Sequence, residues 1–236
     1  MINLNKIKNV LFMFCHPDDE TLGAGGTINK FKRSGKNIFL ALSGMGIQSR
    51  HKLVTKQRDF KLNSQKNKIA KDLQKVLKIY KIKNNNFIVG NFPDNKSDTI
   101  PLLDIIKWCE EVIDKTKPEI IFTHHKGCTN IDHRRLYEAI IVATRPNPKN
   151  KISVFSSEIL SSTGYLKPSK FEPNLFIELS KKDIQAKIKA MNCYTTEKRK
   201  YPHPRSPEAI KALSMLRGAY SGNKYAEGFL VENLFI

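Results

Sequence analysis

Short apolar runs that alternate with helical patterns are the feature of this sequence that most constrains its fold. Six runs of strand length are bounded by turn-forming residues, and most of them are rich in β-branched or aromatic side chains. They cover residues 9–15, 37–43, 86–90, 119–125, 152–159 and 175–180. Strands that alternate with helices predict a layered α/β fold with a largely parallel sheet.

Four segments carry the helical pattern. In residues 65–81 the apolar positions recur at helical spacing and would form one buried face. These positions are Ile69, Leu73, Val76, Leu77 and Tyr80. Residues 100–115 repeat the pattern and end before Pro118, and two more helices are expected at 181–193 and 206–219. Because no long linker or internal repeat interrupts the chain, a single domain over residues 1–236 is the simplest interpretation.

Hydropathy and cysteine usage indicate the compartment. No stretch approaches the ~18 apolar residues of a membrane span, and the short N-terminal apolar run lacks the cleavage site of a signal peptide. The cysteines Cys15, Cys109, Cys128 and Cys193 are widely spaced, without a CxxC pair. We therefore expect a cytoplasmic protein with reduced thiols, with a ligand or redox role for Cys15 or Cys128 as the alternative.

The formal charge of +19 is the compositional outlier. Between residues 52 and 83, eleven Lys or Arg face only Asp59 and Asp72. Such a surface favours anionic partners, among them nucleic acid, phosphorylated sugars and anionic lipid headgroups. The interleaved aromatic residues of a dedicated nucleic-acid binder are missing, so a solvated helix face is the simpler interpretation.

Two polar clusters follow apolar runs. The segment "CHPDDE" (15–20) follows the first run, and "THHKGCTNIDHRR" (123–135) follows the start of the run at 119–125. Ligands of α/β folds collect at the carboxyl ends of the strands, so the two clusters are expected to meet at one edge of the sheet. Three adjacent acids repel one another unless a positive charge lies nearby, and a divalent metal would supply it.

The residue types in these clusters suit a catalytic metal. His16 and Asp19 are three residues apart and can converge on one ion, and His133 is the natural third ligand. Two histidines and one carboxylate, with one position open for water, are typical of catalytic zinc. Asp18 would then be free to act as general base, and Asp132 could accept a hydrogen bond from a ligand imidazole.

Several segments of the sequence resemble the motifs of a known family. The segment "HPDDETLGAGGTI" (16–28) resembles the signature of the LmbE-like (PIG-L) zinc-dependent deacetylases, and "NIDHR" (130–134) resembles their second motif. Further family-like blocks follow in the expected order, namely "SGMGIQSR", "NFPDNKSDTIPLLDII", "PEIIFTHH", "YPHPRSPEAIKAL" and "AEGF". The resemblance implies a Rossmann-like three-layer α/β/α fold and one zinc ion per chain. It also implies hydrolysis of an N-acetyl group from an N-acetylglucosamine-type sugar by attack of metal-bound water.

The resemblance assigns roles by motif. It implies that His16, Asp19 and His133 are the zinc ligands and Asp18 the general base. Asp132 would orient a ligand without binding the zinc itself.

Two positions depart from the family pattern. Asn130 stands where some members carry a histidine that assists the oxyanion or the leaving amine. An amide cannot transfer a proton, so the donor to the leaving amine is open between Asp18 and His203. Cys128 stands where the family block commonly reads "GDLNIDH" with an acid, which changes local hydrogen bonding but not the expected metal site.

Three residues are candidates for binding substrate. Arg50 follows the second run and could hold a hydroxyl or a phosphate, although a surface arginine is equally compatible with its position. His203 and Arg205 lie in the loop "YPHPRS", which could fold over the site or be merely structural. The segment "GAGG" (23–26) lacks the spacing of a phosphate-binding loop, so its glycines are expected to let a helix pack closely against the sheet.

Taken together, the sequence predicts a zinc-dependent N-deacetylase acting on an N-acetylated amino sugar, linked to a nucleotide, a lipid or another conjugate in glycoconjugate biosynthesis. One alternative is a zinc amidase acting on a non-sugar amide. Another is a nucleic-acid-binding protein that uses the basic 52–83 surface. The sequence is compatible with a homo-oligomer but does not predict one.

Overall fold

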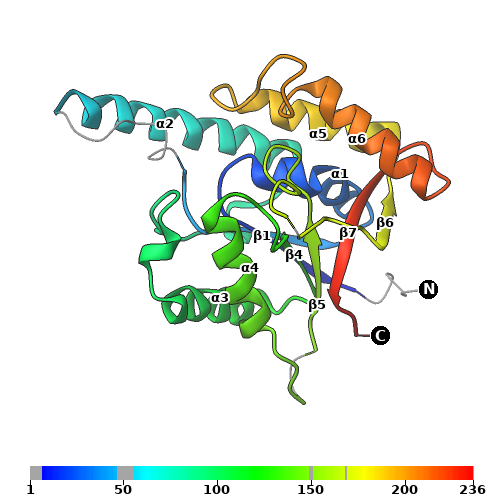
Figure 1. Ribbon diagram of the computed structural model, residues 1–236, viewed down its shortest axis with the longest axis horizontal. Helices are drawn as coiled ribbons and strands as arrows, with labels where there is room; N and C mark the ends of the chain where they lie inside the picture. The colour runs from blue at the N-terminus through cyan, green and yellow to red at the C-terminus, as the bar shows by residue number, and fades with distance from the viewer. Residues whose placement is uncertain (1–6, 47–55, 149–150, 168, 236) are drawn as a thin grey trace.

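The computed structural model describes residues 7–46, 56–148, 151–167 and 169–235 (Figure 1). The strands are β1 (Asn9–Phe14), β2 (Asn37–Leu42), β3 (Phe87–Val89), β4 (Ile120–His124), β5 (Ser153–Ser157), β6 (Leu175–Glu178) and β7 (Ala226–Asn233). The α-helices are α1 (Asp19–Arg33), α2 (Lys56–Ile79), α3 (Leu102–Thr116), α4 (Ile131–Ala143), α5 (Lys181–Cys193) and α6 (Pro207–Tyr220). Two short 3-10 turns, η3 (Asn84–Asn86) and η4 (Ser97–Thr99), complete the described elements.

All seven strands form one sheet in the order β3-β2-β1-β4-β5-β7-β6. The first five strands of this order are parallel, and β7 runs antiparallel to both β5 and β6. The chain builds β2 and β3 on one side of β1, then β4 and β5 on the other. The carboxyl ends of β1 and β4 therefore lie side by side at the point where the strand order reverses, which is where open α/β sheets bind ligands.

Helices cover both faces of the sheet (Figure 1). Helices α1, α2, α5 and α6 lie on one face, and α3 packs with α4 on the other. Each face has its own apolar core, and the central strand β4 is buried along its whole length. The observed architecture confirms the predicted three-layer fold with a mostly parallel sheet.

The glycines at the start of α1 permit the close approach that was expected of them. A Cβ atom on Gly23 would crowd Phe14 of β1 and Ser157 of β5. A Cβ atom on Gly26 would collide with Leu179, which follows β6. A side chain at either position would therefore push α1 away from the sheet.

The predicted helical face of α2 is confirmed. The five predicted apolar positions are buried, and Leu73, Val76, Leu77 and Tyr80 pack in the core that also contains residues of α1 and α5. The lysines beside them, Lys68, Lys71, Lys75 and Lys78, are exposed. These lysines of the basic 52–83 segment therefore lie on a solvated helix face, as the sequence suggested.

Strand β7 was not among the predicted strands. Glu227 and Gly228 interrupt its apolar pattern, although Glu227 is buried. Its carboxylate accepts hydrogen bonds from the backbone N–H groups of Gly26 and Thr27 and pairs with Lys187 at 2.7 Å. A buried acid with several donors satisfies its charge internally, which an alternation rule cannot anticipate.

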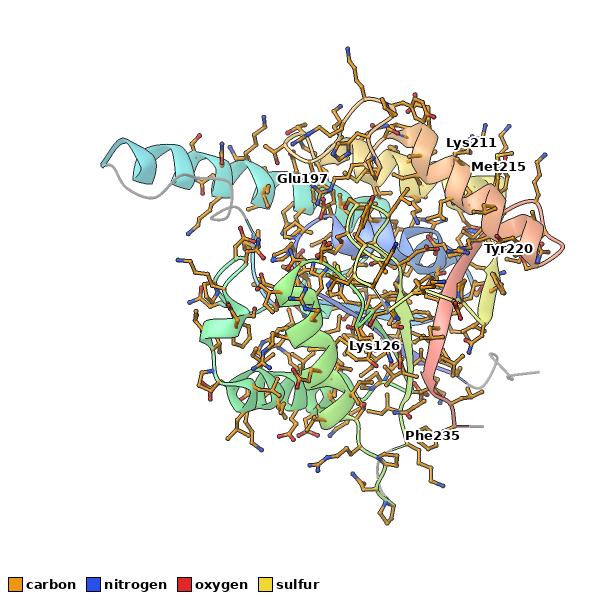
Figure 2. The ribbon with its side chains drawn as sticks, in the orientation of Figure 1. Lys126, Glu197, Lys211, Met215, Tyr220 and Phe235 are labelled. Carbon is orange, nitrogen blue, oxygen red and sulfur yellow. The ribbon has the colours of Figure 1, made fainter. Side chains whose placement is uncertain are left out.

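The outer face of α6 carries exposed side chains, among them Lys211, Met215 and Tyr220 (Figure 2). Among the described residues, no helix combines the length and the apolar character that crossing a membrane requires.

Phe122 on β4 provides a test of the core. Its ring stacks on Phe12 at 4.9 Å between centroids and meets Phe229 edge-on at 4.8 Å. We expect Phe122→Ala to lower the free energy of unfolding by about 3–5 kcal/mol, measured by urea denaturation. As the control, Leu103→Ala should change it by less than about 0.5 kcal/mol, because Leu103 is 60% exposed. A loss below about 1 kcal/mol for Phe122→Ala would contradict the described packing.

Candidate active site

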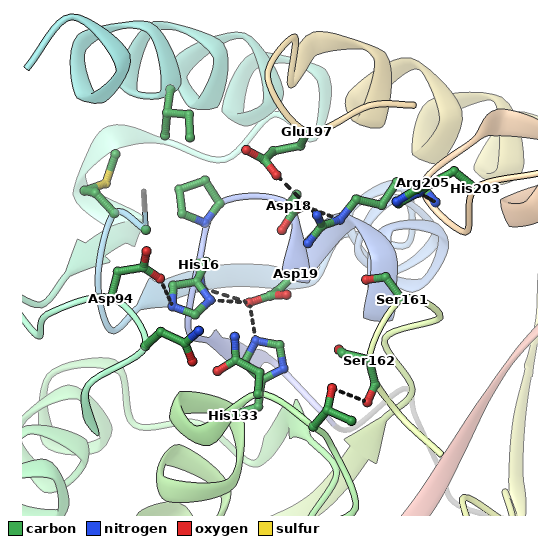
Figure 3. A pocket seen from close by; sticks show the side chains of 17 residues that line it. His16, Asp18, Asp19, Asp94, His133, Ser161, Ser162, Glu197, His203 and Arg205 are labelled. Atoms are coloured by element: carbon green, nitrogen blue, oxygen red, sulfur yellow. Dashed lines mark hydrogen bonds and ion pairs between the residues drawn. The ribbon is translucent and has the colours of Figure 1, made fainter. Parts of the chain in front are cut away.

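The two polar clusters meet at a cavity of about 380 Å³ beside the carboxyl ends of β1 and β4 (Figure 3). The loops that follow β1 and β4 supply one wall, and loops from elsewhere in the chain supply the others. The lining residues are His16, Pro17, Asp18, Asp19, Met45, Gly46, Ile69, Asp94, Asn95, Thr129, Asn130, His133, Ser161, Ser162, Glu197, His203 and Arg205.

Two helix starts place the functional side chains. After β1, Asp18 adopts a left-handed backbone conformation with φ of 111°, a strained state for a residue other than glycine. Asp19 then begins α1, and its carboxylate accepts the backbone N–H of His16 at 2.9 Å. After β4, Asn130 caps α4 by accepting the N–H of Asp132 at 2.8 Å, which turns His133 toward the cavity.

His16, Asp19 and His133 converge on one point. Asp19 Oδ2 lies 3.3 Å from His16 Nδ1 and 3.1 Å from His133 Nε2. His133 Nε2 is buried, yet it has no partner of hydrogen-bonding geometry among the described residues.

These separations fit a metal ion. Ligand atoms about 2.0–2.1 Å from a tetrahedral metal are about 3.3 Å from one another. The three potential ligand atoms also lie within 4.8 Å of one another as a group. The donor set and the orphaned nitrogen therefore suit a divalent metal ion.

Asp132 supports this group from behind. Its Oδ2 atom lies 2.9 Å from His16 Nε2, so His16 can donate there while its Nδ1 faces Asp19. The carboxylate also accepts the backbone N–H groups of Asn95 at 2.5 Å and of Ser97 at 2.9 Å. Asp132 thus ties the loop before α3 to His16.

The contact between His16 and Asp132 shifts the pKa of both groups. Burial opposes the charge of both groups, but their mutual hydrogen bond outweighs it together with the contacts of His16 to Asp19 and of Asp132 to Ser97. In the metal-free protein the pKa of His16 rises to about 10 and the pKa of Asp132 falls to about 2.

Asp18 faces a different set of partners. It is buried, and Arg205 Nε lies 3.0 Å from its Oδ2 atom. Arg205 also approaches Glu197 at 3.4 Å. Burial raises the pKa of Asp18 well above its usual value, while the Arg205 guanidinium opposes this shift.

A second buried acid, Glu20, contacts the backbone of Asp18. Its carboxylate accepts hydrogen bonds from the backbone N–H of Asp18, the Tyr194 hydroxyl and the Thr21 hydroxyl. Burial outweighs these bonds and raises the pKa of Glu20 to about 7. Glu20 therefore fixes the strained backbone that presents Asp18 to the cavity.

Other potential metal-binding groups occur close by. Cys15 and His124 form one group with His133, and His16 forms another with Asp94 and Asp132. Cys15 and His124 are fully buried and do not line the cavity, and burial raises the pKa of the Cys15 thiol. The His124 ring stacks on His133 with centroids 3.7 Å apart. Of these three groups among the described residues, His16, Asp19 and His133 form the one whose members all line the cavity, because Asp132 lies outside the lining.

Most of the predicted site residues lie together. His16, Asp18, Asp19, Asn130, His133, His203 and Arg205 line the cavity, and Asp132 lies directly behind His16. Arg50 lies outside the described residues, so its expected contact with substrate stays a prediction.

The sequence interpretation missed several cavity residues. They are Met45, Asp94, Asn95, Thr129, Ser161, Ser162 and Glu197. Asp94 and Asn95 belong to the block "NFPDNKS", which resembled the family but received no role. The two serines and Glu197 come from loops far along the chain, and no local pattern places them at the site.

Comparison with known proteins identifies the family. The sequence profile described as PIG-L: GlcNAc-PI de-N-acetylase matches residues 11–144, and the chain belongs to this family. It is 25% identical over 252 residues to a diacetylchitobiose deacetylase of Thermococcus kodakarensis, covering 98% of this chain and 86% of that protein. It is also 25% identical over 195 residues to the uncharacterised deacetylase YaiS of Escherichia coli, covering 79% of this chain and 90% of that protein.

Solved structures share the fold. The N,N'-diacetylchitobiose deacetylase of Pyrococcus horikoshii superposes with a TM-score of 0.74 at 19% identity, over 97% of this chain and 85% of that chain. A 4-carboxy-2-hydroxymuconate hydratase of Pseudomonas putida superposes with a TM-score of 0.70 at 18% identity, over 98% of both chains. Because the two relatives are named for different reactions, the fold alone does not fix the chemistry.

Asp132 offers a test of the site's architecture in the metal-free protein. Asp132→Ala would leave the backbone N–H groups of Asn95 and Ser97 without their acceptor. We expect the free energy of unfolding to fall by about 2–3 kcal/mol, measured by urea denaturation with a chelator present. Asp98→Ala, an exposed acid in the same loop, should change it by less than about 0.5 kcal/mol. Equal effects of the two substitutions would contradict the supporting role of Asp132.

Proposed function

We propose that this protein is a zinc-dependent hydrolase that removes the N-acetyl group from an N-acetylated amino sugar. The observation that carries the proposal is the convergence of His16, Asp19 and His133 at the wall of a cavity that also contains Asp18. Membership of the PIG-L family and the deacetylases among its relatives support the same reaction class.

The cavity suits a sugar. Its volume of about 380 Å³ lies in the range of small-molecule sites. Hydroxyl and amide side chains from three loops line it, among them Asn95, Thr129, Ser161 and Ser162. Such groups can exchange hydrogen bonds with several sugar hydroxyls.

His16, Asp19 and His133 would hold the zinc ion, one per chain. When bound, zinc polarises a carbonyl oxygen and lowers the pKa of a water molecule. Asp132 would keep His16 in the tautomer that presents Nδ1, because it accepts the proton at Nε2.

Asp18 would act as the general base. Burial raises its proton affinity, and Arg205 beside it stabilises the ionised form that must accept the proton. The carboxylate would take a proton from the attacking water at Oδ1 or Oδ2. The same proton can then pass to the leaving amine, which would release acetate and the free amino sugar.

His203 is the second candidate for proton donor to the amine. Its Nδ1 atom accepts the backbone N–H of Arg205 at 3.1 Å, so Nε2 carries the proton in the neutral ring. Asn130 uses its carbonyl oxygen to cap α4, which leaves its amide N–H groups to bind substrate without transferring a proton. We propose that the main role of Arg205 is to stabilise the Asp18 carboxylate and that contact with substrate is its lesser role.

The proposal extends to the whole chain. The family match covers residues 11–144, but Ser161, Glu197, His203 and Arg205 reach the same cavity from later segments, which supports one domain over residues 1–236.

A nucleotide-linked or lipid-linked sugar, and a role in glycoconjugate biosynthesis, fit the excess of positive charge. A cytoplasmic location stays a prediction.

The test is acetate release from N-acetylglucosamine, UDP-N-acetylglucosamine and N,N'-diacetylchitobiose by the zinc-loaded protein. We expect release from at least one compound, and a loss of about 100-fold or more in kcat for Asp18→Asn with bound zinc unchanged. Asp98→Asn, which changes an exposed acid that does not line the cavity, serves as the matched control and should keep full activity.

Undiminished release by Asp18→Asn would remove the proposed base. No release from any compound, by protein that binds one zinc ion, would favour an amidase for non-sugar amides. A protein without zinc that binds RNA or DNA with a steep salt dependence would favour the basic surface as the functional feature.

A further inference from the structure

Cys128 touches the proposed zinc ligand His133 on the side away from the zinc focus. Its Sγ atom lies 3.1 Å from His133 Nδ1, whereas the Nε2 atom of the same ring faces Asp19. Cys128 is fully buried and does not line the cavity. The sulfur therefore contacts the ring from behind, much as Asp132 contacts His16.

The protons of the ring explain why this contact matters. A neutral imidazole carries one N–H group, and the other nitrogen offers a lone pair. His133 can present a lone pair at Nε2 only if Nδ1 holds the proton, and that N–H group then needs an acceptor. Among the described residues, Cys128 Sγ is the group in hydrogen-bond contact with Nδ1.

Ser162 completes the arrangement. Its Oγ atom lies 3.1 Å from the same sulfur and can accept the thiol S–H. With its own proton directed to Ser162, the sulfur keeps its lone pairs for the N–H group of His133. The chain of contacts therefore runs from Ser162 through Cys128 to His133.

We propose that Cys128 is a positioning residue that fixes the orientation and the Nδ1–H tautomer of His133 for metal binding. Cys128 stands where the family motif carries an acid, so a sulfur acceptor would replace a carboxylate behind this ligand. The inference rests on the proposed zinc site and adds to it a residue that neither binds the ion nor touches substrate.

The backbone holds the sulfur in place. Cys128 forms a β-bridge with Thr163, and the N–H of Thr129 donates to the carbonyl oxygen of Ser162 at 2.9 Å. The Arg134 guanidinium donates to the carbonyl oxygen of Cys128 at 2.7 Å. Because Ser162 also lines the cavity, this loop contributes both to the substrate wall and to the orientation of a metal ligand.

Direct coordination by Cys128 is the competing interpretation. Cys15, and not Cys128, is the cysteine that groups with His124 and His133 within 4.8 Å among the described residues. Cys128 contacts the nitrogen of His133 that faces away from Asp19. An orienting contact therefore fits the geometry better than a sulfur ligand.

The experiment measures the zinc dissociation constant of the whole protein by competition with a chromophoric chelator. Cys128→Ala and Cys128→Val both remove the acceptor. Ala is smaller than Cys and Val is larger, so an effect that both share reports the lost acceptor rather than a change of volume. We expect zinc binding to weaken about 10–100-fold in both, as for other contacts behind metal ligands. Cys128→Asp restores the acid of the family motif and should bind zinc within about threefold of the parent protein.

Cys109→Ala is the matched control, because Cys109 is also a fully buried cysteine but lies in α3 and does not line the cavity. It should leave zinc binding unchanged. Circular dichroism identifies the variants that fold, and either Cys128→Ala or Cys128→Val suffices for the comparison.

Three results would overturn the inference. The first is a folded Cys128→Ala or Cys128→Val variant with the zinc affinity of the parent protein. The second is a thiolate-to-cobalt charge-transfer band in the Co²⁺-substituted parent that disappears in Cys128→Ala, because Cys128 would then be a ligand. The third is a parent protein that binds no zinc, which would overturn the proposed function as well and is thereby distinguished from the first two.

Discussion

The site depends on the contacts that the buried carboxylate of Asp19 makes with His16 and His133. Its Oδ2 atom lies within 3.3 Å of nitrogen atoms from two histidines, and burial alone would oppose its charge. The neighbouring His133 and His16 more than offset that cost, so the pKa of Asp19 lies well below its usual value. A buried charge of this kind persists only where positive partners surround it, and a metal ion would be the strongest such partner.

The fold brings these groups together through its strand order. Asp19 follows β1 and His133 follows β4, and the two strands are neighbours although about a hundred residues separate them in the chain. Asp19 begins α1 and His133 lies in the first turn of α4, so the backbone of each is fixed by helix geometry rather than by a free loop. In the proposed site, the contacts of Asp132 with His16 and of Cys128 with His133 set the direction of each ring.

Local patterns were sufficient for much of this arrangement. The alternation of apolar runs predicted the parallel core, and the spacing within "CHPDDE" and "NIDHR" indicated which side chains could meet. Glu227 shows where such reasoning ends, because an acid inside β7 breaks the strand pattern and its partners are distant in the chain. They are the N–H groups of Gly26 and Thr27, 201 and 200 residues away, and the Lys187 ammonium, 40 residues away. Glu197 and Ser162 likewise reach the cavity through tertiary packing that no short motif encodes. The partner of Cys128 was not predictable either, because a cysteine pattern does not reveal which side chain lies beside the sulfur.

The most direct measurement is the zinc content of the parent protein and of Asp19→Ala after equilibration with zinc and removal of the excess. The proposed site predicts about one zinc ion per chain in the parent and almost none in the variant, with the fold retained by circular dichroism. A folded Asp19→Ala protein that keeps one zinc ion per chain would contradict the central claim that His16, Asp19 and His133 together hold the metal.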